Sequence, residues 1–227
     1  MDIDVQDTGS SSDVPTSDHR SRRRLLGAGM LGLAGSLLPQ LASRAGATTP
    51  PTDSASTDSA PVAATTTTAP PERPTNDDLP LLGFAQSLEL AAVALYDIAL
   101  AGKELGDDRA LFTTLREAHL AYTQVLSALL GRQAPGAVLD AAVTQFQDGF
   151  GGSTKDVLAA AYDLEATALA THDELIGVLL GTDGVALITS ILIAEARHCT
   201  VLADLAGSTD LDMLLLSDAT ALEPTKG

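Results

Sequence analysis

The sequence predicts an all-α protein, a four-helix bundle made of two helical hairpins that are joined by a long crossover. Leucine and alanine recur at helical spacing through four segments, whereas the residue types that favour strands are scarce. The second hairpin repeats the first at a distance of 76 positions. The segment between the hairpins, residues 132–152, is long enough to cross a bundle from end to end.

The internal repeat appears when residues 82–131 are aligned without gaps to residues 158–207. Of these 50 aligned pairs, 16 are identical. Alanine inflates that number, but it does not account for the glutamates shared at Glu89 and Glu165. We therefore interpret this part of the chain as two copies of one helical hairpin.

Start and stop signals bound the four predicted helices. Residues 76–78 can cap the first helix, Gly131 closes the second, and the breaker at 149–152 precedes the third. We expect a short helix over 136–146 within the crossover. The apolar tail, 210–221, is expected to pack on the bundle or on a second subunit. The predicted helices cover residues 78–105, 108–130, 153–180 and 183–207.

Residues 1–47 have the pattern of a targeting segment. Ser21 to Leu26 resembles the twin-arginine export signal of bacteria. An uncharged, glycine-rich apolar run follows over 25–43, and residues 45–47 resemble a small-residue cleavage site. We therefore expect export by the twin-arginine pathway followed by cleavage of the signal peptide. The alternative is that the apolar run stays in place as a membrane anchor.

Residues 48–76 consist mainly of Thr, Pro, Ser and Ala. Such a segment buries too little apolar surface to offset the entropy of ordering, so we predict a disordered linker. The folded domain is expected over residues 77–220, a length that is ample for one hydrophobic core.

The net charge of −17 limits the classes of partner. The predicted signal peptide holds five Arg and five Asp, so the mature chain carries the whole negative charge. That balance opposes binding to nucleic acid and to anionic lipid, and we expect no stable membrane span after signal cleavage. Cys199 is the only cysteine, which excludes an intrachain disulfide. The sequence leaves a homodimer open as one possibility and identifies no other protein partner.

Acidic and histidine side chains in apolar helical segments form the candidate site. Glu195 and His198 lie three residues apart, on one helix face, where both can reach one metal ion. Their oxygen and nitrogen donors suit iron or manganese. Glu89 and Glu165 stand among apolar residues, where an acid is costly to bury unless it is paired or bound to metal.

The repeat relates this Glu-x-x-His pair to a changed copy in the first hairpin. Glu195 aligns with His119, and His198 aligns with Tyr122. His119 can still bind a metal, whereas Tyr122 is a poor ligand for a divalent ion. The first hairpin therefore lacks a second copy of the complete motif.

Two further aligned residues follow the repeated glutamates at a distance of seven. Tyr96 follows Glu89 and His172 follows Glu165, so two helical turns place each pair on one face. We expect Tyr96 to donate a hydrogen bond to a site carboxylate. His172 is either a hydrogen-bonding support of the site or an ordinary helix residue.

The helix pattern, the crossover and the repeated glutamates resemble the ferritin-like superfamily over about residues 78–207. The resemblance is to exported bacterial ferritin-like domains. It implies one Glu on each of two helices and Glu-x-x-His on each of the other two, around two iron or manganese ions. From their positions in the repeat, we also expect Tyr96, Tyr122 and His172 to support the site without binding the metal directly. Carried to this chain, the implied metal ligands are Glu89, His119, Glu165, Glu195 and His198.

Two functions follow from these residues. The first is a metal-binding bundle with one or two iron or manganese ions, or zinc, that could oxidise Fe(II) or react with peroxide. The second is a non-catalytic binding or structural module whose polar residues form a buried hydrogen-bond network without metal. These residues leave open whether the chain is an enzyme, and none of them is assigned as catalytic. Iron storage in a cage is disfavoured, because nothing in the chain indicates a shell-forming surface.

Overall fold

A computed structural model describes residues 69–102, 105–215 and 218–224. The predicted signal peptide, 1–47, and residues 48–68 of the predicted linker lie outside the described residues. Within these ranges the chain forms helices and no strands. The long helices are α2 (Asp78–Ala101), α3 (Arg109–Leu130), α5 (Thr154–Val178) and α6 (Thr182–Leu205), and the shorter ones are α4 (Asp140–Phe150) and α7 (Leu211–Leu215).

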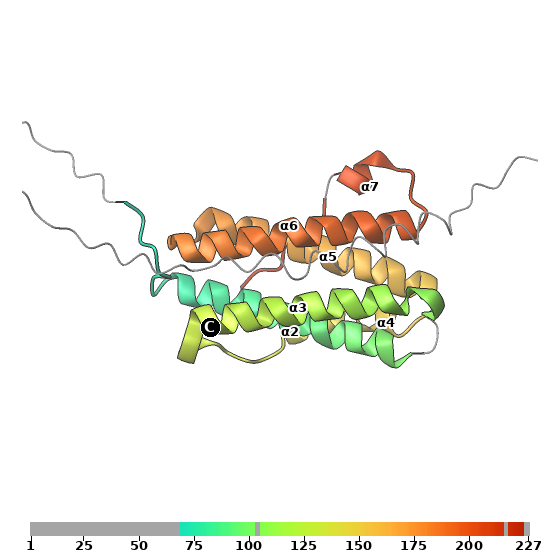
Figure 1. Ribbon diagram of the computed structural model, residues 1–227, viewed down its shortest axis with the longest axis horizontal. Coiled ribbons are helices and arrows are strands. Elements are labelled where there is room, and N and C mark those ends of the chain that lie inside the picture. Colours follow the sequence, from blue (N-terminus) through green and yellow to red (C-terminus); the bar gives the residue numbers. More distant parts are fainter. Residues whose placement is uncertain (1–68, 103–104, 216–217, 225–227) are drawn as a thin grey trace, which may run out of the picture. The chain divides into compact units, whose positions relative to one another are not determined.

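The four long helices form a bundle of two antiparallel hairpins (Figure 1). Helix α2 packs along α3, and α5 packs along α6, while α4 lies in the crossover and contacts both α2 and α5. Single turns of 3-10 helix flank α3, at Gly106–Asp108 and Gly131–Gln133. The all-α bundle predicted from the sequence is therefore confirmed.

The crossover helix begins four residues later than the expected start at 136. Gly136 adopts a positive φ of 60°, and its N–H donates to Gln86 Oε1 at 3.0 Å. A left-handed backbone at this position cannot start an α-helix, so the turn residue delays it. Leu139 N–H then bonds to Ser87 O at 3.0 Å, which fixes the start of α4 against α2.

Close backbone approach fixes the other end of the crossover helix. A Cβ atom on Gly149 would lie 2.6 Å from the Cβ of Ala160, so α4 and α5 meet at two small residues. Helix α5 then starts at a capping box, in which Ser153 and Asp156 each bond to the other's backbone N–H. These contacts set where α5 enters the bundle.

Asp78 ties the start of α2 to the turn between α5 and α6. Its buried carboxylate accepts hydrogen bonds from the N–H groups of Thr75 at 2.7 Å, Leu180 at 2.8 Å and Gly181 at 3.0 Å. Upstream, the carbonyl of Pro71 accepts a hydrogen bond from the backbone of α6 at 3.0 Å. Contacts with the bundle therefore begin within the segment predicted as linker.

The bundle interior has a polar layer between two apolar clusters. One cluster includes Leu95, Phe112 and Phe150, and the other includes Leu82 and Ile188. Between them, near the middle of each long helix, lie buried ionisable side chains. We call the following six residues the polar layer: Glu89, His119, Glu165, His172, Glu195 and His198.

The tail prediction is met only in part. Helix α7 lies against α6, but Leu211 and Leu215 expose 66% and 76% of their surface. Leu222, further along the chain, does pack on the apolar core of the bundle. Its backbone N–H also donates to Thr171 Oγ1 at 2.9 Å.

By length and apolar composition alone, α2 and α6 could each cross a membrane. The core helices of a bundle meet the same criterion, because they too are long and largely apolar. Both helices also bury an ionisable residue of the polar layer near their middle, Glu89 in α2 and Glu195 in α6. Their composition is therefore weak support for a membrane span.

Candidate metal centre

The structure brings all five predicted ligands together in the polar layer. Helix α2 contributes Glu89, α3 contributes His119, α5 contributes Glu165, and α6 contributes both Glu195 and His198. Each side chain is buried. Two sets of three have donor atoms within 4.8 Å of one another, namely His119, Glu165 and His198, and Glu89, His119 and Glu195.

Glu165 has the most contacts in the layer. The Tyr96 hydroxyl donates to its Oε1 at 2.5 Å, and His119 Nε2 lies 3.0 Å from the same oxygen. His198 Nδ1 lies 3.0 Å from Oε2. Burial alone would raise the pKa of Glu165, but the charges and hydrogen bonds of His198 and His119 outweigh it and lower that pKa. Glu165 is therefore an ionised carboxylate in a region that excludes water.

His119 lies between two carboxylates. Its Nδ1 is 2.6 Å from Glu89 Oε2, and its Nε2 is 3.0 Å from Glu165 Oε1. Burial would lower the pKa of His119, yet Glu165 and Glu89 together raise it well above its usual range. In the absence of a metal, this raised pKa favours the positively charged form of His119, which stands where the resemblance implies a glutamate.

His172 and Glu195 form a second pair, in which His172 Nδ1 lies 2.8 Å from Glu195 Oε2. Burial acts to lower the pKa of His172, but the carboxylates of Glu195 and Glu89 raise it. Burial raises the pKa of Glu195, and the contact with His172 offsets only part of that effect. The sequence suggested His172 only as a support of the site, and the structure places it inside the polar layer.

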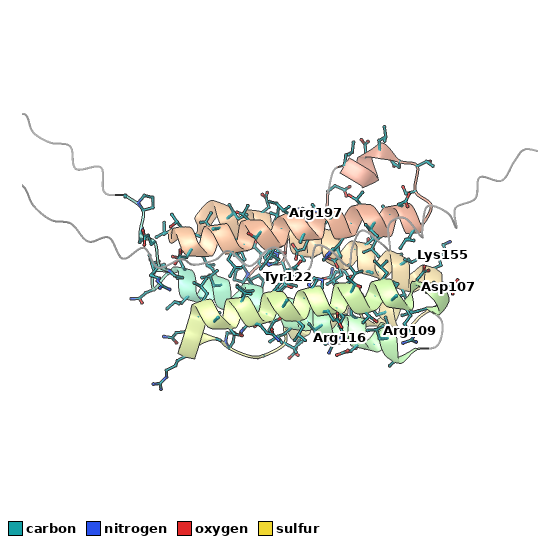
Figure 2. The ribbon with its side chains drawn as sticks, in the orientation of Figure 1. Asp107, Arg109, Arg116, Tyr122, Lys155 and Arg197 are labelled. Atoms are coloured by element: carbon teal, nitrogen blue, oxygen red, sulfur yellow. The ribbon has the colours of Figure 1, made fainter. Side chains whose placement is uncertain are left out.

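Tyr122 stands beside the layer. Its ring packs edge-on against His119, with ring centroids 5.8 Å apart, and Figure 2 shows it between α3 and α6. Burial and then the charges of Glu89 and Glu165 raise the pKa of its hydroxyl. Tyr122 thus stays protonated, which agrees with its expected role as a neighbour of the ligands.

The residues that flank His198 in the motif point elsewhere. Arg197 is exposed on α6, as Figure 2 shows, and it does not neutralise the buried acids. Cys199 is buried, and burial raises the pKa of its thiol. It therefore behaves as a small apolar residue, not as a thiolate ligand.

Three buried polar atoms of the layer have no hydrogen-bond partner: Glu89 Oε1, His172 Nε2 and Glu195 Oε1. Leaving a buried polar atom without a partner costs about 1–3 kcal/mol. Carboxylate oxygens and imidazole nitrogens are also the donors that first-row transition metals bind. The side chains of this layer therefore fit a metal ion.

Tyr96→Phe tests how Glu165 is held. Loss of the hydroxyl removes a buried hydrogen bond to a charged group, so the free energy of unfolding should fall by about 1.5–3 kcal/mol. Urea denaturation measures this value. Tyr122→Phe is the matched control, since it keeps the ring contact with His119 and should change stability by less than about 0.5 kcal/mol. Equal losses in both variants would contradict this role for Tyr96.

A protein-family model described as a ferritin-like domain matches residues 77–208, which is more than half of the chain. The chain belongs to the ferritin-like domain family. No curated protein and no solved structure matches it. The resemblance to the ferritin-like superfamily is thus confirmed.

Within this ferritin-like domain, α3 departs from the ligand pattern that the resemblance implies. His119 stands where the resemblance implies Glu, and Tyr122 stands where it implies His. The other three long helices keep the implied Glu89, Glu165 and the pair on α6. The buried His and Glu groups could hold a metal ion in spite of this departure.

Proposed function

We propose that this ferritin-like domain binds one or two transition-metal ions, iron or manganese, in its polar layer. The observation that carries the proposal is the convergence of five buried donors from four helices beside three unpartnered polar atoms. Mixed oxygen and nitrogen donors in a bundle core suit these metals.

The charge of the layer supports the same proposal. Three carboxylates are buried, and in the described part of the chain their ion pairs are all with histidines. A buried carboxylate is costly unless a cation accompanies it. A divalent ion would supply that charge and release the histidines to act as neutral ligands.

We also propose that the bound metal takes part in redox chemistry. Bound iron or manganese would supply electron transfer, with Fe(II) or peroxide as substrate. The chain itself orients the ligands: Tyr96 fixes Glu165 through its hydroxyl, and the apolar cluster around Phe112 keeps water away.

We further propose that the domain is exported by the twin-arginine pathway and released by signal cleavage. That route carries folded proteins, so a metal would be loaded before export. The support is the sequence pattern of residues 1–47 and the Thr- and Pro-rich segment that follows.

Loading of purified protein with Fe(II) under anaerobic conditions tests the metal proposal. Wild type should retain at least one ion per chain, and the double variant Glu195→Ala with His198→Ala should retain well under one, as elemental analysis would show. Glu117→Gln is the control, because Glu117 is exposed on α3 only two residues from His119. Retention of well under one ion by folded wild type would contradict the proposal.

The second candidate is a metal-free module, and the position of His119 favours it. A charged His119 between Glu89 and Glu165 neutralises part of the buried acid without any ion. In that case the layer would be a buried hydrogen-bond network with a structural or binding role. The three unpartnered atoms favour metal over this alternative.

A further inference from the structure

The two copies of the repeat exchange a tyrosine and a histidine at two positions. His172 lies 76 residues after Tyr96, and Tyr122 lies 76 residues before His198. The repeat relates the surroundings of Glu89 to those of Glu165. Near Glu165 there is an imidazole at His198, whereas the equivalent position near Glu89 is Tyr122. Near Glu89 there is instead an imidazole at His172, whereas the equivalent position near Glu165 is Tyr96. The exchange keeps one imidazole on each side of the layer.

The contacts follow the same exchange. Tyr96 on α2 reaches across to Glu165 on α5, with its hydroxyl 2.5 Å from Oε1. His172 on α5 reaches back to Glu89 on α2, with its Nε2 3.5 Å from Oε1. Tyr96 brings a hydroxyl to the carboxylate, whereas His172 brings a nitrogen that can bind a metal.

The distance between His172 Nε2 and Glu89 Oε1 suits two ligands of one ion. At 3.5 Å the two atoms do not form a hydrogen bond, and both lack any other partner. Two donors that each lie about 2.1 Å from one ion are about 3.4 Å apart at a tetrahedral angle. An ion between them would satisfy both unpartnered atoms.

The other ring nitrogen of His172, Nδ1, already has a carboxylate partner that can orient the ring. His172 Nδ1 lies 2.8 Å from Glu195 Oε2, and an ionised carboxylate only accepts, so in a neutral His172 beside an ionised Glu195 the proton is on Nδ1. The lone pair is then on Nε2, which faces Glu89. A metal-binding histidine commonly donates its second N–H to a carboxylate in this way.

From this geometry, and resting on the proposed metal function, we infer that His172 is a direct metal ligand through Nε2 and shares an ion with Glu89. Glu195 orients its ring through the contact with Nδ1. The rival is an ion pair in which a charged His172 faces Glu89 and Glu195 without metal.

Nitrogen-15 NMR of the histidine side chains in the full chain, with Zn(II) as a diamagnetic probe, separates the two. Zn(II) should shift His172 Nε2 to the metal-bound range while the proton stays on Nδ1. The assignment comes from the signal that is lost in His172→Gln. An Nε2 that keeps its proton in zinc-loaded protein would overturn the inference.

Zinc affinity gives a second readout. It distinguishes a failure of the role inferred for His172 from a failure of the proposed metal-binding function. His172→Gln should lose one ion per chain, or bind it at least about 10-fold more weakly. Glu174→Gln, exposed on the same helix, should bind as wild type does. If wild type binds zinc and His172→Gln binds it equally, only the role of His172 fails. If folded wild type binds neither zinc nor iron, the proposed function fails with it.

Discussion

Glu165→Gln should lower the free energy of unfolding by about 3–5 kcal/mol and abolish metal retention. Its carboxylate is the shared partner of Tyr96, His119 and His198. Glutamine keeps the shape but removes the charge, so His198 would lose its carboxylate partner and His119 would keep only Glu89. The same change removes the oxygen donor of the set formed with His119 and His198.

Urea denaturation in a chelator measures the stability change, and elemental analysis after Fe(II) loading measures retention. Glu174→Gln is the matched control, because Glu174 is exposed on the same helix and should change stability by less than about 0.5 kcal/mol. A Glu165→Gln protein that is as stable as wild type and still binds metal would show that this carboxylate has no central role.

The metal-free protein should lose stability as the pH rises above about 6.5, the ordinary pKa of histidine. The folded protein raises the pKa of His119 and of His172, so their contribution is complete below that pH and is lost as each folded pKa is passed. For each proton that the folded protein binds and the unfolded chain has lost, the free energy of unfolding falls by about 1.4 kcal/mol per pH unit.

At acid pH the stability of the metal-free protein changes with pH in the opposite direction. The folded protein lowers the pKa of Glu165, so its contribution is present above the ordinary glutamate value of about 4.3 and is lost as the pH falls. Glu195, whose pKa is raised, instead acts in the same direction as the histidines. We therefore expect greatest stability of the metal-free chain between about pH 4.3 and 6.5.

Metal should reverse the slope on the alkaline side. Histidine binds a metal in its neutral form, so affinity, and with it the stability gained from metal, rises with pH. Urea midpoints measured from pH 5 to 9 should fall with pH in the presence of a chelator and rise with pH in the presence of Mn(II). The His119→Gln variant should show a smaller fall in the presence of the chelator. Metal-free stability that increases from pH 6.5 to 8 would contradict this charge assignment.

The fold and the convergence of the five predicted donors followed from the sequence because both depend on short-range patterns. Leucine and alanine spacing gave the helices, and the alignment of Glu89 with Glu165 pointed to the interior face. Helical hairpins with that spacing bring mid-helix residues to one level, so the five predicted donors meet. The match to the family over 77–208 agrees with this assignment.

What the sequence did not give depends on contacts between distant segments. The late start of the crossover helix comes from the bond of Gly136 to Gln86, fifty residues away. The exposure of Leu211 could not be read from its apolar character. The direction of His172 toward Glu89 depends on how two hairpins pack, and spacing within one helix carries no such information.

An anomalous difference map tests the central claim most directly. Crystals of Fe(II)-loaded full-length protein, measured at the iron absorption edge, should show at least one peak within the polar layer, at bonding distance from Glu165 and a histidine. A map with peaks only on the acidic surface, from crystals in which the bundle is intact, would contradict the account.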